Sequence, residues 1–366
     1  MNDDFDVNAL HEAWTDSLRE AWNGGQLPEG SMGGALPETW SEEWRGTERD
    51  VRVVMARMPV EVWDGFEFDR VPWSRFPHVF GPGEEIAEEL GRLRSADAPT
   101  VLSVIRGLWG CVCHAGQPSA PGALAVPFLL RLAADPSTHH RSEVLWLVGG
   151  VARRVHNHEF GRGDLLLVGY ADDEWAFPAC GYLQNWSIAA ARDAITADAG
   201  IVTALLDDPD PEVRCVAAYV LAAASGEVDG IVAALHDRLR VEGVARVRAC
   251  LVLAIAQLAR EHPDEGAVAW MRTCWADPGR PAEVRVSAAL GWLCLVDDPV
   301  PDTLRTALDD CVTHELARSM ASMPWMTQID HYGDGLTHTL QRIFDPDALR
   351  LSPSRKSEGC ADDPPF

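Results

Sequence analysis

The chain has 366 residues and a mass of 40.0 kDa, which allows one elongated domain or two compact ones with a sizeable core. Apolar residues make up 47% and charged residues 24%, a globular composition rather than a disordered one. Asp and Glu number 56 against 31 Lys and Arg, so the formal net charge is -25. Because phosphate backbones are bound by cationic surfaces, this charge argues against a nucleic-acid-binding protein and favours a basic protein partner.

The sequence also predicts where the protein resides. It contains no run of 18 apolar residues, so no membrane span is expected. The stretch Met1–Asp6 is acidic where a secretory signal would be basic and then apolar. Nine cysteines are scattered along the chain instead of framing a small disulfide module, so they are expected to be reduced core thiols. We therefore expect a cytoplasmic protein.

The N-terminal segment, residues 1–83, differs in character from the rest. Apolar residues recur at every fourth position from Leu10 to Trp22, as on one face of a helix. Residues 23–37 are rich in Gly and Pro and predict a linker. Trp and Phe then occur among prolines, with a helix predicted over 48–58. We interpret this segment as a helix, a linker and an aromatic-rich cap over the open end of the helices that follow.

Helical patterns begin after this segment. A helix is predicted over 99–113, and a degenerate helical unit is predicted over 125–154. A further helix starts near Ser187 and leads into the clearest part of the sequence. Strand patterning is nearly absent throughout, which predicts an all-α fold.

An internal repeat occupies residues 200–296. Each unit opens with Gly and an apolar helix, passes a charged turn, and then reaches Val-Arg and an Ala-rich helix. Three Val-Arg pairs mark the units at intervals of 34 and 37 residues: Val213-Arg214, Val247-Arg248 and Val284-Arg285. A period of this length is typical of stacked helix pairs, because one hairpin cannot bury its own apolar face.

The first of these turns shows how each unit is punctuated. The stretch from Asp208 to Pro211 cannot continue a helix, because proline lacks a backbone donor and restricts the residue before it. Asp210 is predicted to cap the next helix, with Pro211 at its first position and Glu212 beside its positive end. A helix is therefore expected to begin at Pro211.

These units resemble the HEAT-like repeats of bacterial proteins, most strongly over 200–296. In that family an acidic residue in the turn and an Arg early in the second helix recur and pair between helices. The matching side chains, which the resemblance makes structural repeat anchors, are Asp208 with Arg214, Glu242 with Arg248, and Asp277 with Arg285. The resemblance implies an α-solenoid of HEAT-like helical hairpins over 84–345, followed by a flexible tail over 346–366.

Tryptophans in the irregular and terminal segments are candidates for partner binding. Exposed Trp side chains are common interface anchors, whereas buried ones would cap the ends of the solenoid. These candidates are Trp40, Trp44, Trp63, Trp73 and Trp325. The Gly/Pro-rich loop that contains His114 and Gln117 resembles a loop of some bacterial HEAT-like proteins. Loops on a rigid scaffold often carry function, although a plain connection between hairpins is the alternative.

Cys111, Cys113 and His114 form the nearest approach to a metal motif. A structural zinc site needs about four closely spaced ligands, and no second pair at such a spacing follows. His139-His140 and His156–His158 could join only if the fold brought them together. We therefore predict buried thiols beside a loop histidine, with no metal and no cofactor.

Enzymatic interpretations have weaker support. His156–His158 is not an H-N-H nuclease motif, because that motif needs its residues far apart. Acidic stretches at 172–174 and 207–210 resemble the magnesium motifs of terpene cyclases, but the second, Asn-containing motif is missing. HEAT-like DNA glycosylases hold DNA in a basic groove, which the net charge of -25 opposes.

The sequence therefore predicts a non-enzymatic protein–protein interaction module. Its acidic solenoid surface would bind a basic protein, as a scaffold or as an immunity protein that masks a basic nuclease toxin. The alternative is a HEAT-like enzyme, such as a DNA glycosylase or a small-molecule enzyme that uses the concave face.

Overall fold

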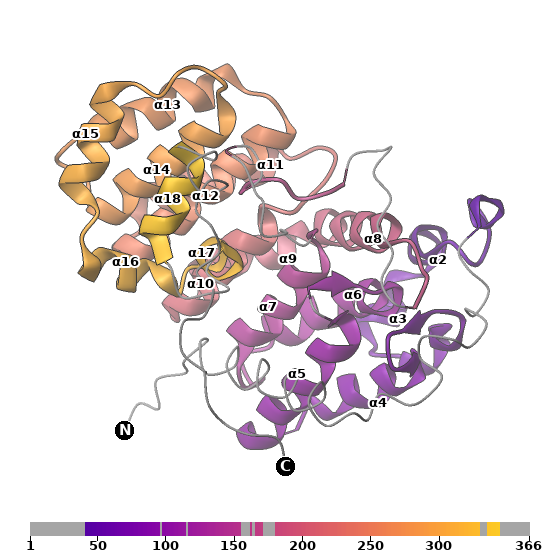
Figure 1. Ribbon diagram of the computed structural model, residues 1–366. Coiled ribbons are helices and arrows are strands. Elements are labelled where there is room, and N and C mark those ends of the chain that lie inside the picture. The colour runs from indigo at the N-terminus through magenta and orange to yellow at the C-terminus, as the bar shows by residue number, and fades with distance from the viewer. Residues whose placement is uncertain are drawn as a thin grey trace, which may run out of the picture.

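The computed structural model describes residues 41–95, 97–114, 116–154, 162, 165–170, 180–329 and 335–344 (Figure 1). This part of the chain is mostly helical, as the sequence predicts. None of its helices is long and apolar enough to cross a bilayer. Trp40, the predicted helix over 10–22, the linker over 23–37 and the predicted tail over 346–366 lie outside the described residues.

The first half of the molecule begins with short elements and continues with longer helices. These are η1 (Glu42–Trp44), α2 (Val51–Arg57), α3 (Val60–Asp64), η2 (Phe68–Arg70), η3 (Trp73–Arg75), α4 (Glu84–Arg92), α5 (Ala98–Val112), α6 (Ala120–Ala134), α7 (Arg141–Val151) and α8 (Gln184–Ala197). Two small antiparallel hairpins interrupt them, β1 (Pro77–His78) with β2 (Gly81–Pro82) and β3 (Cys113–His114) with β4 (Gln117–Pro118). The helices predicted over 48–58 and 99–113 correspond to α2 and α5.

The second half consists of helices joined by short turns. They are α9 (Ala199–Ala204), η4 (Leu205–Asp207), α10 (Pro211–Leu221), α11 (Asp229–Val241), α12 (Ala245–Glu261), α13 (Glu265–Ala276), α14 (Ala282–Leu295), α15 (Asp302–Cys311), α16 (His314–Ala321), α17 (Pro324–Ile329) and α18 (Gly335–Phe344). Asp210 caps α10 as predicted, because its side chain accepts a hydrogen bond from the Glu212 amide.

Helix α6 lies at the centre of the first half, and nearly all of its residues are buried. It contacts α3, α4, α5, α7 and α8, so it is covered on every side. Ser119 caps its N-terminus by accepting a hydrogen bond from the Gly122 amide. Arg131 is its one charged residue, and the guanidinium pairs with Asp64 before the helix and Asp198 after it.

The aromatic N-terminal segment packs directly against α6. The rings of Trp63 and Phe68 lie 4.9 and 4.8 Å from the ring of Phe128, centre to centre. Trp73 lies beside the same phenylalanine and donates its indole N–H to the Phe68 carbonyl. Trp63 and Trp73 are both buried. The structure therefore places both side chains in the core, which agrees with the alternative of buried tryptophans and not with that of exposed anchors.

In the second half, successive second helices pack side by side. Helix α10 contacts α7 on one side and α12 on the other, and α12 contacts α14. Val213, Val247 and Val284, which mark the sequence repeat, are all buried. Figure 1 shows α11 to α18 gathered in one part of the molecule and α2 to α8 in the other, with α9 and α10 between them.

Trp325 is the largest of the fully buried side chains, with none of its surface exposed. Its indole N–H donates to the Gln257 side-chain oxygen at 2.7 Å, and Gln257 donates in turn to the Ala222 carbonyl. The Tyr219 ring packs edge-on against it at 4.9 Å. Trp325 therefore also agrees with the alternative of a buried tryptophan, and its polar atom is satisfied within the core.

The ion pairs of the repeat turns join successive turns instead of closing within one unit. Asp208 pairs with Arg141, the first residue of α7, at 2.7 Å between oxygen and nitrogen. Arg214 donates to the Asp208 carbonyl and pairs with Glu242 of the following turn. These contacts between successive turns replace the predicted pairing of Asp208 with Arg214. They also replace the predicted pairing of Glu242 with Arg248, because the Glu242 carboxylate pairs with Arg214 and Arg238 instead.

The third turn of the repeat uses its anchors in another way. Arg285 donates to the Trp275 carbonyl, and Asp277 accepts from the Gly279 amide. Both contacts are made where α13 joins α14, and neither reaches another turn. The longer turn of this unit explains the difference, because it places the carboxylate eight residues before the guanidinium.

We expect Glu242→Gln to destabilise the protein at neutral pH. Burial alone would raise the pKa of Glu242, but hydrogen bonds from Arg214, the Val244 amide and Arg238 lower it to about 2 from a usual value near 4.5. A carboxylate with a depressed pKa contributes stability above its unfolded pKa and loses it as the pH falls. Urea unfolding at pH 7 should therefore show a loss of about 3 kcal/mol.

The difference between the wild type and Glu242→Gln should shrink between about pH 5 and pH 2, where the wild-type carboxylate becomes protonated. The exposed Glu227 provides a matched control, because Glu227→Gln should change the unfolding free energy by less than about 0.5 kcal/mol. A loss at pH 7 that persists unchanged at pH 2 would contradict this account.

Candidate functional site

Trp44 lies at a surface groove between the N-terminal segment and the start of α8. The groove has a volume of about 500 Å³, and its described lining residues are Trp44, Glu48, Arg49, Ser74, Arg75, Pro77, Cys180, Gly181 and Tyr182. The Arg49 guanidinium lies over the Trp44 ring at 5.1 Å, and Arg75 pairs with Glu48 at 2.8 Å. Among the described tryptophans proposed as anchors, Trp44 is partly buried, whereas Trp63, Trp73 and Trp325 are buried.

Tyr182 fixes one wall of this groove. Its hydroxyl accepts a hydrogen bond from the Val51 amide and donates one to the Arg49 carbonyl, both at 2.9 Å. Burial raises the pKa of Tyr182 above its usual value, so the hydroxyl stays protonated. Burial also raises the pKa of the Cys180 thiol, which makes that sulfur a poor nucleophile. Neither group is therefore activated as a nucleophile.

His114 and Gln117 lie on the hairpin formed by β3 and β4, where Gly116 takes the positive φ that the turn requires. The His114 ring packs edge-on against Phe80, at 5.0 Å between ring centres. Phe80 lies at the turn of the neighbouring hairpin and is 65% exposed. Burial lowers the pKa of His114, which favours its neutral form. The two turns therefore form one surface with an exposed aromatic ring.

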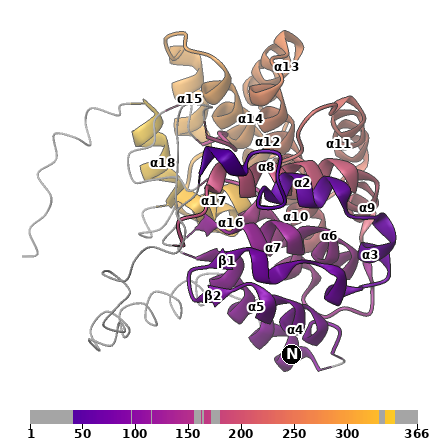
Figure 2. The same ribbon diagram turned by 90° about the vertical axis from the view of Figure 1, so that its right-hand side faces the viewer.

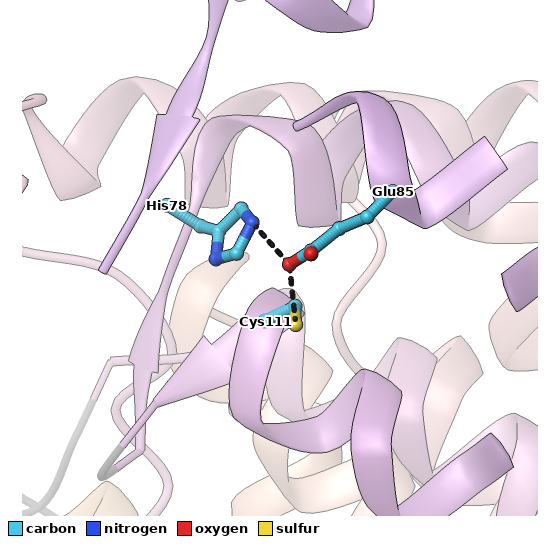
Figure 3. A group of neighbouring side chains, drawn as sticks. All are labelled: His78, Glu85 and Cys111. Carbon is cyan, nitrogen blue, oxygen red and sulfur yellow. Dashed lines mark hydrogen bonds and ion pairs between the residues drawn. The ribbon is translucent and has the colours of Figure 1, made fainter. Parts of the chain in front are cut away.

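Beside these hairpins, the fold brings together His78, Glu85 and Cys111 (Figure 3). His78 is the last residue of β1, Glu85 lies in the first turn of α4, and Cys111 lies in the last turn of α5. The Glu85 carboxylate points between the other two side chains, 2.8 Å from His78 Nε2 and 3.4 Å from Cys111 Sγ. One ligand atom of each residue lies within 4.8 Å of the others.

The environment of each group differs. The His78 side chain is fully buried, whereas Glu85 is 56% exposed and opens the cluster to solvent. Burial, together with the hydrogen bond to Glu85 and the nearby negative charges, raises the pKa of Cys111 to about 12. The thiol is therefore neutral at physiological pH and is not activated as a nucleophile. Imidazole, carboxylate and thiolate groups are, however, all zinc ligands.

The sequence identified Cys111 but not its neighbours. Cys113 faces the other way and donates to the Gly150 carbonyl, and burial raises its pKa to about 12. His114 packs against Phe80 and is not part of the cluster that Figure 3 shows. The Gly-Pro-Gly run at 81–83 was the available signal, because it predicts a sharp turn that returns the chain after His78.

Comparison of the chain with protein-family models, with curated proteins and with solved structures finds no significant match. The functional argument therefore rests on the residues of this chain.

We expect Tyr182→Phe to loosen the N-terminal segment, because it leaves the buried Val51 amide without its acceptor. The cost should be about 1–3 kcal/mol in urea unfolding, as for an unsatisfied buried donor. Tyr170→Phe is a matched control, since the Tyr170 hydroxyl bonds the Gln184 side chain at a partly exposed position. An equal loss in both variants would show that the bridge to α2 has no special role.

Proposed function

We propose that the protein is a non-enzymatic interaction module, a HEAT-like α-solenoid that binds a basic protein through an acidic edge. The arrangement of the helices supports the first part. The pairs α9–α10, α11–α12, α13–α14 and α15–α16 follow one another through short turns, and α7, α10, α12 and α14 lie side by side. Stacked hairpins of this kind present long surfaces suited to binding another macromolecule.

The location of the charges supports binding of a basic protein. Several arginines are held inside the structure by carboxylates, among them Arg141 with Asp208, Arg192 with Glu261 and Arg214 with Glu242. Among the described residues, exposed carboxylates outnumber exposed guanidinium groups. The charge that a partner meets is therefore mainly negative, in line with the net charge of -25.

One edge of the helix array carries a concentration of this charge. Because successive helices alternate in direction, the turns that lead into α11, α13 and α15 lie on the same side. We define the acidic edge as the exposed acids of these turns: Glu227, Asp229, Asp264, Glu265, Asp297, Asp298 and Asp302. Arg260 is the one exposed basic residue among the described residues of these turns. This charge imbalance is the observation that carries the proposal.

An acidic edge of this kind would accelerate association with a basic surface and disfavour nucleic acid. An immunity protein whose acidic edge takes the place of nucleic acid on a basic nuclease is the sharpest form of the proposal. A glycosylase would instead need a basic groove with a free catalytic carboxylate. In the groove beside Trp44, the carboxylate of Glu48 is already paired with Arg75.

The partner should be sought by affinity capture. The tagged chain is incubated with lysate of its source organism, washed at low and then at high salt, and the bound proteins are identified by mass spectrometry. We expect one basic protein that is retained at low salt and released at high salt. Recovery of no protein, or of a partner that is indifferent to salt, would contradict an electrostatic interaction module.

Neutralising the acidic edge should then weaken the purified complex. We expect the triple variant Asp264→Asn, Glu265→Gln and Asp302→Asn to lower the affinity about tenfold or more at low salt, mainly through slower association. Asn keeps the capping role of Asp264 at the start of α13, which separates binding from stability. Surface plasmon resonance at several salt concentrations measures the effect, which should vanish at high salt.

The control removes three exposed acids elsewhere, by Glu61→Gln, Asp69→Asn and Glu88→Gln. This variant has the same net charge as the first but an intact acidic edge. Equal weakening by both variants would mean that net charge, and not this edge, determines binding.

A further inference from the structure

We propose that His78, Glu85 and Cys111 form a binding site for one divalent cation of the zinc class, with a fourth position open to water. The three residues are named here as the zinc cluster. The inference is independent of the acidic edge and of any partner. It is carried by three ligand groups of different chemistry that converge from three separate elements.

The buried histidine is the first argument. The His78 side chain is fully enclosed, and its Nε2 atom faces the cluster. The Glu85 oxygen lies 2.8 Å away but off the direction of the ring N–H, so Nε2 has no well-aligned hydrogen bond. A buried polar atom without an aligned partner is costly. A metal ion at the centre of the cluster would satisfy it.

The distances are the second argument. With zinc–ligand bonds of about 2.0–2.3 Å, a tetrahedral site places its ligand atoms about 3.3–3.7 Å apart. The oxygen and sulfur of the cluster are already 3.4 Å apart, and all three ligand atoms lie within 4.8 Å of one another. Glu85 is more than half exposed and can rotate to open the shorter contact with His78. Small side-chain movements therefore complete the geometry.

The donor set decides which cation is favoured. A thiolate and an imidazole nitrogen select zinc and similar borderline-soft ions, whereas magnesium and calcium prefer oxygen ligands. Three protein ligands with one open position are typical of zinc sites that keep a water. The exposed side of Glu85 provides the path by which an ion can enter.

Binding has a consequence for the neighbouring hairpin. His78 Nδ1 now accepts a hydrogen bond from the Phe80 amide at 3.3 Å. When Nε2 ligates a metal, a neutral imidazole carries its proton on Nδ1, which can then no longer accept. The hydrogen bond from the Phe80 amide to Nδ1 would therefore be lost, which removes one contact that holds the exposed aromatic turn. Occupancy of the zinc cluster is thereby coupled to the surface that Phe80 and His114 form.

The test is a zinc titration of the full-length, chelator-stripped protein in competition with a chromogenic chelator, with magnesium in excess throughout. We expect the wild type to bind one zinc ion. Cys111→Ser and Glu85→Gln should each lower the affinity for zinc by about 100-fold or more, since even changes to outer-shell residues cost 10–100-fold. Cobalt in place of zinc should show a thiolate charge-transfer band that Cys111→Ser abolishes. Zinc should raise the melting temperature of the wild type but not of Glu85→Gln.

Two variants serve as matched controls. Glu88→Gln removes an exposed carboxylate from the same helix, and Cys113→Ser removes the neighbouring thiol that points away from the cluster. Both should bind zinc within about threefold of the wild type, which is far less than the loss of a ligand. Circular dichroism establishes that each variant is folded, and Glu85→Gln keeps the test informative if Cys111→Ser is unstable. No zinc binding by the wild type, or binding by Cys111→Ser and by Glu85→Gln that is as tight as that of the wild type, would overturn the proposal.

Discussion

The burial of α6 on every side is the constraint on which the rest of the first half depends. A helix without a polar face must be covered completely, and the segments on either side of it in the sequence supply that cover. The aromatic rings of the N-terminal segment pack against Phe128. The Arg131 guanidinium pairs with Asp64 and Asp198, which lie 67 residues before and after it in the sequence. The irregular segment is therefore an integral part of the core rather than an appendage.

Local chemistry made much of the helical structure predictable. Proline and aspartate marked the start of α10, and the Val-Arg pairs located the buried faces of three helices. Long-range packing was not predictable. Trp63 and Trp325 stood in irregular or terminal segments, yet both are buried, because the sequence does not reveal which distant surface needs a large side chain. The cluster of His78 and Glu85 with Cys111 was not predictable for the same reason, since only the tertiary fold brings these residues together.

The two proposals draw on opposite uses of charge. Along the repeats, carboxylates inside the structure hold arginines, and those at the acidic edge remain free to attract a partner. In the zinc cluster, a single carboxylate stands between a buried imidazole and a neutral thiol. Figure 2 shows the β1–β2 hairpin and α4 and α5 far from α13 and α15, so the two regions can act separately.

The ion pairs between successive turns have a consequence for how such a chain can change in length. Asp208 supplies the counter-charge of Arg141, and Glu242 from the next unit supplies that of Arg214. A chain cut after α10 would therefore remove the carboxylate that pairs with Arg214 and uncover the face of α10 that packs against α12. Units joined in this way are not interchangeable modules. Evolution or engineering can add or remove one only by rewriting the charges on both sides of the junction.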